Sequence, residues 1–253
     1  MDMMAYQHNN KISSKETHFL KTKLVLTWLL EFRVSNVDVL SKRLNLLPVN
    51  TSRFFQNLIK KEFIQKFRNN HAAHNQHYLM LTPTGRNHLQ DVCGVDATNA
   101  RTSVSSFKHN TQLQHNINVQ KFVLSEMDDF GEVVCSHNID MQDTKNRPDA
   151  LIKHRNPEYW VAVEYEHWRK NKKRIYHAVT NHVDAIQAKK WMGVYYVFRE
   201  KTDFRYYYNL LQADLWPRYH LNRNTGVIKA MQKPFDVATI PNVRQMFKMR
   251  LLA

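Results

Sequence analysis

Apolar residues recur at helical spacing near the start of the chain, for example at Leu20, Leu24 and Trp28. Side chains at such spacing share one face of a helix, so a first helix is predicted here. Asn50 or Thr51 would cap a later helix, since their side chains accept hydrogen bonds from a helix start. The pattern over this part predicts three helices, a β-hairpin and a further helix: 19–34, 37–46, 52–61, 63–67 with 78–81, and 84–89.

The pattern changes after residue 106. Leu113, Ile117, Phe122 and Met127 follow a helical period, and short apolar runs then alternate with turn residues. The predicted order is helix, three strands, helix, strand, with two closing helices: 113–127, 132–137, 149–152, 160–166, 170–190, 193–198, 202–211 and 243–252.

These elements predict a mixed α+β or α/β protein of two domains. A polar and flexible N-terminal arm (1–18) precedes the first domain (19–92). A stretch of small and polar residues (93–106) is the predicted linker, and the second domain covers 107–253.

The first domain resembles winged helix-turn-helix DNA-binding domains, in its three short helices before a hairpin and in the run L-T-P-T-G-R (81–86). The resemblance implies that the third helix enters a major groove. A winged helix that makes only protein contacts remains an alternative. The groups expected to face DNA are Asn50, Thr51, Ser52, Arg53, Gln56, Asn57 and Lys60.

The net charge of the chain indicates which classes of binding partner to expect. Lys and Arg number 37 against 22 Asp and Glu, a net charge of +15, which favours nucleic acid first and a membrane surface second. No apolar run is long enough to span a bilayer, and the N-terminus lacks the apolar core of a secretion signal. Two cysteines are too few for a disulfide framework. We expect a cytoplasmic protein without membrane insertion.

The candidate chemistry lies between residues 147 and 176. Asp149 stands just before an apolar strand, and Glu164 and Glu166 share one face of the next strand, since side chains alternate. A hairpin of these strands would gather three carboxylates, which repel each other unless a cation such as Mg²⁺ or Mn²⁺ joins them. A solvated strand edge with weak ion pairs is the alternative. A phosphate-attracting basic segment follows: Arg169, Lys170, Lys172, Lys173 and Arg174.

The αβββαβ order, with P-D before the second strand and E-x-E on the third, resembles the PD-(D/E)xK nucleases, which have a restriction-endonuclease-like fold. In that superfamily an Asp and a Glu bind a divalent metal, and a Lys usually stands two residues after the Glu. Glu166 occupies that position here. Lys170, Lys172 or Lys173 would have to supply the missing lysine.

The motifs of the two domains taken together are more specific than those of either domain alone. A winged helix followed by H-N-I-N-V (115–119), R-P-D-A (147–150) and V-E-Y-E (163–166) resembles the replication-relaxation family, and within it the MobC-type plasmid mobilization relaxases. The resemblance implies nicking of one DNA strand at a plasmid origin of transfer, beside a relaxosome accessory protein and a coupling protein. It adds His115 and Glu126 as candidates near the acidic centre, although His115 could equally be a core histidine.

The expected mechanism is metal-dependent. Asp149 and Glu164 would hold the ion, Glu166 would ligate it or position water, and Lys170 or Lys172 would counter the charge on the phosphate. A non-catalytic origin-binding or regulatory protein with a decayed nuclease domain is the rival. A covalent route through a tyrosine is a further alternative, with these candidates: Tyr176, Tyr195, Tyr196 and 206–208.

Overall fold

The computed structural model describes residues 13–71, 76–140, 147–155, 157–222 and 224–252. The mixed α+β class is confirmed. The chain divides into two compact units, residues 1–124 and 125–253. Most of the expected N-terminal arm lies outside the described residues. None of the helices in the described ranges has both the length and the apolar character needed to cross a membrane.

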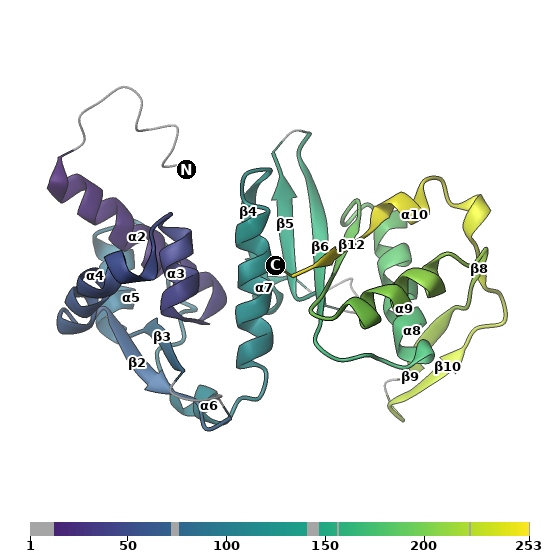
Figure 1. Cartoon of the computed structure of the whole chain (residues 1–253), viewed down its shortest axis with the longest axis horizontal. Coiled ribbons are helices and arrows are strands. Elements are labelled where there is room, and N and C mark those ends of the chain that lie inside the picture. Colours follow the sequence, from purple (N-terminus) through teal and green to yellow (C-terminus); the bar gives the residue numbers. More distant parts are fainter. Residues whose placement is uncertain (1–12, 72–75, 141–146, 156, 223, 253) are drawn as a thin grey trace. The chain divides into compact units, whose positions relative to one another are not determined.

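The first unit combines helices with a small antiparallel sheet whose strand order is β1-β3-β2 (Figure 1). The pattern missed β1, which is only two residues long and pairs with the middle of β3. The elements are α2 (Ser14–Phe32), β1 (Val34–Ser35), α3 (Val37–Arg43), α4 (Pro48–Lys60), β2 (Ile64–Arg68), β3 (His77–Leu81), α5 (Pro83–Asp91), α6 (Ser105–Lys108) and α7 (Leu113–Ser125).

Side-chain caps define three of these helices, the first through Ser13, whose hydroxyl accepts a hydrogen bond from the Glu16 amide at the start of α2. Asn36 accepts a hydrogen bond from the Val39 amide at the start of α3, and Thr82 accepts one from the Gly85 amide at the start of α5. The expected cap of α4 is wrong, because α4 begins earlier, at Pro48. Proline suits the first helical position, where its fixed φ is already helical and no amide hydrogen is needed.

A buried glutamine ties α7 to the first unit. Gln120 accepts hydrogen bonds from the Trp28 indole (2.8 Å) and the Ser35 hydroxyl (2.7 Å), and it donates one to the Val34 carbonyl (2.8 Å). These groups have no access to water, so each bond is costly to lose. The helix that the pattern assigned to the second domain is therefore part of the first compact unit up to residue 124.

Gly85 allows α5 to pack directly on the backbone before β2. A Cβ at this position would overlap the carbonyl oxygen of Phe63. We expect Gly85→Ala to lower the free energy of unfolding by about 2 kcal/mol, because the backbone would have to move. Urea denaturation followed by circular dichroism would measure this. Thr84→Ala, on the same helix but exposed, is the control and should change little; equal stability of both variants would contradict the expectation.

The second unit is built on a five-stranded sheet with the order β12-β7-β6-β5-β4. β5 pairs antiparallel with both β4 and β6. β7 pairs parallel with β6, and β12 pairs parallel with β7. The elements of the sheet and its two longer helices are β4 (Phe130–Cys135), β5 (Ala150–His154), β6 (Tyr159–Glu166), α8 (Lys172–Gln187), β7 (Val194–Phe198), α9 (Lys201–Leu211) and β12 (Phe247–Leu251).

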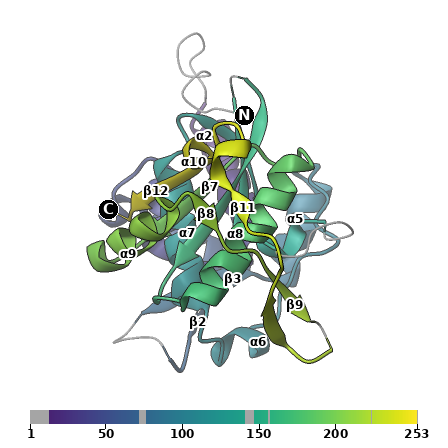
Figure 2. The ribbon, with the colours of Figure 1, turned by 90° about the vertical axis from the view of Figure 1, so that its right-hand side faces the viewer.

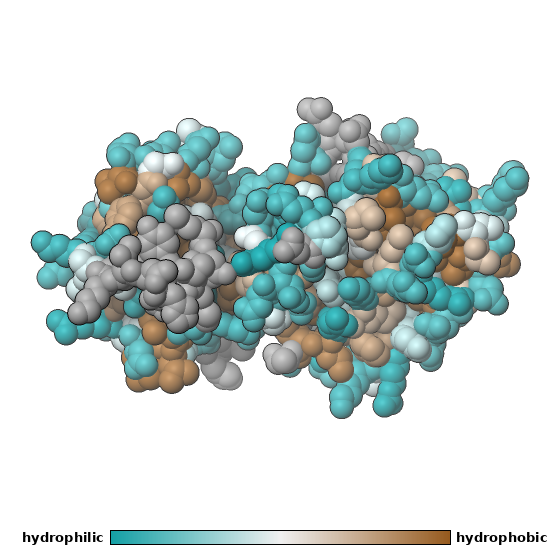
Figure 3. Space-filling view, turned by 90° about the horizontal axis from the view of Figure 1, so that it is seen from above, coloured by the Kyte–Doolittle hydropathy of each residue, from teal (hydrophilic) through white to brown (hydrophobic). Residues whose placement is uncertain are grey.

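Helices α8 and α9 cover one face of this sheet (Figures 1 and 2). Their apolar sides form a core with the sheet, for example Val179 of α8 and Tyr207 of α9 with Tyr196 and Phe198 of β7. Burial of this surface is the main favourable term in folding. On the face of the chain seen in Figure 3, hydrophilic residues cover most of the surface and apolar ones occur in scattered groups.

The segment after α9 differs from the pattern. Residues 243–252 were expected to form one helix, but a single turn is followed by the parallel strand β12. Phe247 and Met249 alternate with Lys248 and Arg250, the period of an edge strand with one face on the core. The single turn is α10 (Val243–Met246), the start of the expected helix. The pattern missed the remaining elements: η1 (Ser136–Asn138), β8 (Leu215–Trp216), β9 (Tyr219–Asn222), β10 (Val227–Ala230), β11 (Phe235–Asp236) and η2 (Val237–Thr239).

Candidate active site

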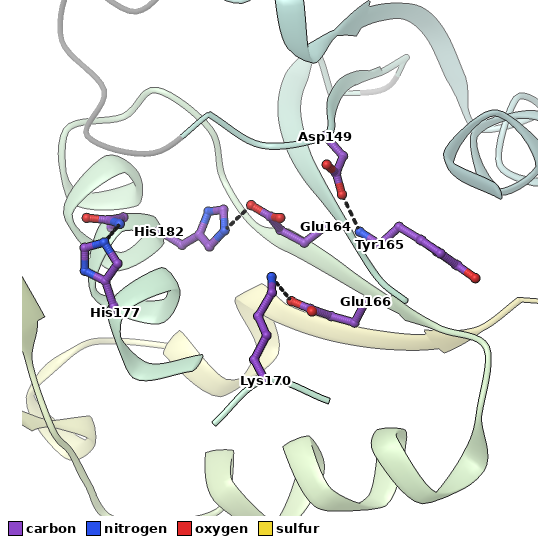
Figure 4. Close-up of polar contacts among 8 residues, drawn as sticks. Asp149, Glu164, Tyr165, Glu166, Lys170, His177 and His182 are labelled. Atoms are coloured by element: carbon purple, nitrogen blue, oxygen red, sulfur yellow. Dashed lines mark hydrogen bonds and ion pairs between the residues drawn. The ribbon is translucent and has the colours of Figure 1, made fainter. Parts of the chain in front are cut away.

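The acidic residues meet where β5 begins and β6 ends. The Asp149 amide donates a hydrogen bond to the Val163 carbonyl (3.0 Å), and the Asp149 carboxylate accepts one from the Tyr165 amide (2.8 Å). Asp149 is therefore held against β6 beside Glu164 and Glu166, which share one face of that strand. Figure 4 shows the three carboxylates in one region. Each has one oxygen held by an N–H donor.

Glu164 is paired with a buried histidine. His182 Nε2 lies 3.0 Å from Glu164 Oε1, and the His182 side chain has no exposed surface (Figure 4). His182 also contacts the rings of Trp191 and Tyr196 edge-on. The sequence contained a signal for this residue that went unused: a histidine interrupts the apolar face of α8 next to Val183. A buried polar group of this kind needs a specific partner.

Glu166 is paired with Lys170, at 2.8 Å between Lys170 Nζ and Glu166 Oε1. Glu166 is only 3% exposed, and its burial raises the pKa of the carboxyl although Lys170 opposes the shift. Burial acts to lower the pKa of Lys170, but Glu166, Glu164 and Asp149 outweigh it and the pKa is raised. The Lys170 ammonium therefore donates a hydrogen bond to Glu166, and the charges of Glu164 and Asp149 also stabilise its protonated form. Lys172 and Lys173 are exposed at the start of α8, so Lys170 is the lysine that the fold brings to the centre.

Two buried tyrosines lie beside the acidic pair. The Tyr196 and Tyr207 rings are 5.8 Å apart and both hydroxyls are buried, with the Tyr207 hydroxyl interacting with the Glu166 carboxyl. Burial, and then the charges of the nearby glutamates, raise the pKa of both hydroxyls. A nucleophile needs the opposite shift, toward a lower pKa. Tyr176 is also engaged, because its hydroxyl donates a hydrogen bond to the Leu210 carbonyl.

Glu126 does not join the centre, which corrects the expectation from the sequence. α7 ends at Ser125, and the charged groups that act on Glu126 are Arg250, Asp129 and Lys248. It also acts on Tyr195, whose side chain points to the opposite face of β7 from Tyr196. Burial raises the pKa of the Glu126 carboxyl. His115 lies on α7 within the first unit.

The donors suit a hard divalent cation, although the described residues contain no group of three His, Cys, Asp or Glu side chains placed to hold a metal ion. Mg²⁺ commonly uses only one or two carboxylates and completes its shell with water and phosphate oxygens. Asp149 and Glu164 are the two carboxylates that could form such a pair. The buried Glu166 carboxyl interacts with the Lys170 ammonium and the Tyr207 hydroxyl.

The predicted DNA-facing residues divide into two groups. Thr51 is wrongly included, because its side chain is buried and its hydroxyl bonds to the Pro48 carbonyl (2.8 Å) and the Ser41 hydroxyl (2.7 Å). It joins α3 to α4. Arg169 of the basic segment pairs with Asp203 at 2.9 Å. The remaining residues of both predicted sets are exposed: Asn50, Ser52, Arg53, Gln56, Asn57, Lys60, Lys173 and Arg174.

In comparisons with known proteins, no protein-family model, curated protein or solved structure gave a significant match to this chain.

Proposed function

We propose that this protein is a metal-dependent DNA nickase that cuts one strand at a plasmid origin of transfer, in the manner of a mobilization relaxase. The observation that carries the proposal is the position of Lys170, whose ammonium interacts with Asp149, Glu164 and Glu166 at one end of a sheet. Acidic groups beside a lysine are the chemistry that phosphodiester cleavage requires: oxygen ligands for a metal and a cation for the developing charge.

The order of elements in the second unit supports a PD-(D/E)xK-type nuclease fold. Strands β4, β5 and β6 form an antiparallel meander, and the crossover through α8 returns the chain to β7, parallel to β6. In this scheme the lysine comes from the segment after β6 rather than from position 166. Glu166 then has a new role, since it holds the ammonium of Lys170 in place.

Asp149 and Glu164 would hold Mg²⁺ or Mn²⁺, and Glu166 would position a water beside them. The bound ion would polarise the scissile phosphate and stabilise the leaving oxygen. His182 orients the Glu164 carboxylate through their hydrogen bond. Lys170 is placed to counter the negative charge that develops on the phosphate, and Glu166 keeps its ammonium protonated by raising its pKa.

The first unit supports a winged-helix DNA-binding role. Its order of elements, its β1-β3-β2 sheet and the exposed polar side of α4 suit a helix placed in a major groove. The net charge of +15 favours contact with DNA phosphates. A relaxosome accessory protein and a coupling protein are the partners that a cytoplasmic relaxase would need.

A regulatory or origin-binding protein without catalysis is the second candidate. Two observations favour it: Glu166 stands where nucleases of this type carry lysine, and no three-ligand metal group occurs in the described ranges. Both candidates share the first unit, so only chemistry at the second unit separates them.

A plasmid relaxation assay tests the proposal. Purified protein is incubated with a supercoiled plasmid carrying its transfer origin, with Mg²⁺, with Mn²⁺ or with a chelator. We expect open circles with either metal and none with the chelator. A plasmid without the origin is the control. Tight binding to the origin with no conversion under any metal would favour the regulatory candidate.

Arg53 provides the test of the first unit. Arg53→Ala should weaken binding to origin duplex about tenfold, because an exposed arginine on the groove-facing helix can contact a base edge or phosphates. Fluorescence anisotropy at fixed salt would measure the change. Lys15→Ala removes an equal charge from the exposed start of α2 and serves as the control. If both variants bind as the wild type does, α4 is not the recognition helix.

A further inference from the structure

Trp168 is the most exposed large aromatic side chain among the described residues of the second unit. It is 75% exposed, whereas Trp191 and Trp216 in the same unit are buried. Most of the indole surface is therefore accessible to a ligand. Trp168 lies two residues after Glu166, in the segment that leads from the acidic strand β6 to α8.

The segment around Trp168 is anchored on both sides. The His167 ring packs edge-on against Trp168, at 4.5 Å between ring centres. Arg169 is fixed by Asp203 at 2.9 Å, and its guanidinium lies 4.9 Å from the centre of the Tyr206 ring. Such anchoring lowers the conformational entropy that Trp168 would lose when a ligand binds.

Cationic residues follow this tryptophan along the chain. Arg169 precedes Lys170, and Lys172, Lys173 and Arg174 are exposed in the first turn of α8. That turn contains no acidic residue, although the start of a helix favours negative side chains. The three cations therefore destabilise this end of α8 in the unbound protein. Binding of an anionic partner would relieve their repulsion.

We propose that a surface made by Trp168, Arg169, Lys172, Lys173 and Arg174, here called the Trp168 surface, binds single-stranded DNA next to the acidic centre. The indole would stack on an unpaired base, and the cations would contact the backbone phosphates. Duplex DNA cannot use the indole in this way, because its bases are already stacked on each other. The inference rests on the proposed function and specifies its substrate: a strand that is locally melted at the cleavage site.

Binding to a short oligothymidylate tests the inference, with the full-length protein in chelator so that no cleavage occurs. We expect Trp168→Ala to weaken binding about tenfold and Trp168→Phe to retain most of it, because one aromatic face still stacks. Leu221→Ala, which removes an exposed apolar side chain from β9, is the control. Binding to a duplex of equal length should change less than twofold in Trp168→Ala.

The salt dependence separates stacking from charge. The double variant Lys172→Ala with Lys173→Ala should reduce the slope of log K against log salt by about 1.4, the value for two phosphate contacts on a single strand. Trp168→Ala should leave the slope unchanged. Lys229→Ala with Lys233→Ala removes two exposed lysines elsewhere in the same unit and should also leave it unchanged.

Wild-type affinity for the oligothymidylate in Trp168→Ala would overturn the inference and would leave a protein partner as the occupant of this surface. The binding measurement does not depend on catalysis, because it is made in chelator. A protein that binds single strands through Trp168 but never nicks would refute the proposed function alone, and a nickase unaffected by Trp168→Ala would refute this inference alone.

Discussion

Glu164→Gln should reduce metal-dependent nicking of a supercoiled origin plasmid about a thousandfold, which corresponds to roughly 4 kcal/mol of transition-state stabilisation. Glutamine fills the same volume and can still accept a hydrogen bond from His182, so the buried site keeps its shape. It lacks the negative charge that attracts a divalent cation. Single-turnover nicking rates at saturating Mg²⁺ and Mn²⁺ would give the effect.

The same loss is expected for Asp149→Asn, since both carboxylates belong to the proposed metal pair. Glu158→Gln is the matched control: its carboxylate is exposed and pairs with Lys153 at 2.9 Å, so nicking should be unchanged. Circular dichroism should show that all three variants remain folded. Wild-type nicking by both Glu164→Gln and Asp149→Asn would place the chemistry elsewhere and refute the assignment of the metal pair to these two residues.

Lys170→Met should affect both activity and stability. Nicking should fall about a hundredfold, because the cation that counters charge on the phosphate is lost. The free energy of unfolding should fall by roughly 2 kcal/mol at neutral pH, since Glu166 would be left as a buried charge without its partner. This value is below that of a fully buried pair, because the Lys170 side chain is 39% exposed.

The stability loss in Lys170→Met should depend on pH in a defined direction. Burial raises the pKa of Glu166 in the folded state, so the folded protein holds that proton more tightly than the unfolded chain does. Stability linked to this group is greatest below its unfolded pKa and declines as the pH rises through the folded one. Without Lys170 the folded pKa rises further, so the decline should extend to higher pH and be larger in total.

Urea denaturation at pH 5 and at pH 8 would measure this difference. The gap between wild type and Lys170→Met should be small at the lower pH, where Glu166 in the variant can take up a proton, and larger at the higher pH. Adding Glu166→Gln to Lys170→Met should restore most of the stability, because no buried charge remains. A gap that is the same at both pH values would mean that the ion pair does not stabilise the fold.

Strongly periodic elements could be predicted from the sequence. The helices that became α2, α3 and α8 and the strands that became β2, β3, β5, β6 and β7 follow local patterns of apolar residues. Such patterns report which face of an element is buried, whatever it packs against. The strands β1 and β12 could not be found in this way, because each is defined by pairing with a distant strand, β3 and β7 respectively.

The candidate site shows the same division. The sequence by itself determined that Glu164 and Glu166 share a face, because alternation along a strand is a local property of the backbone. Only the tertiary structure decided that Lys170 rather than Lys172 meets Glu166, that His182 pairs with Glu164, that Thr51 is buried and that Glu126 lies elsewhere. Those outcomes depend on distances between elements that are separate along the chain. Such distances are set by the packing of side chains across the core, which no local pattern contains.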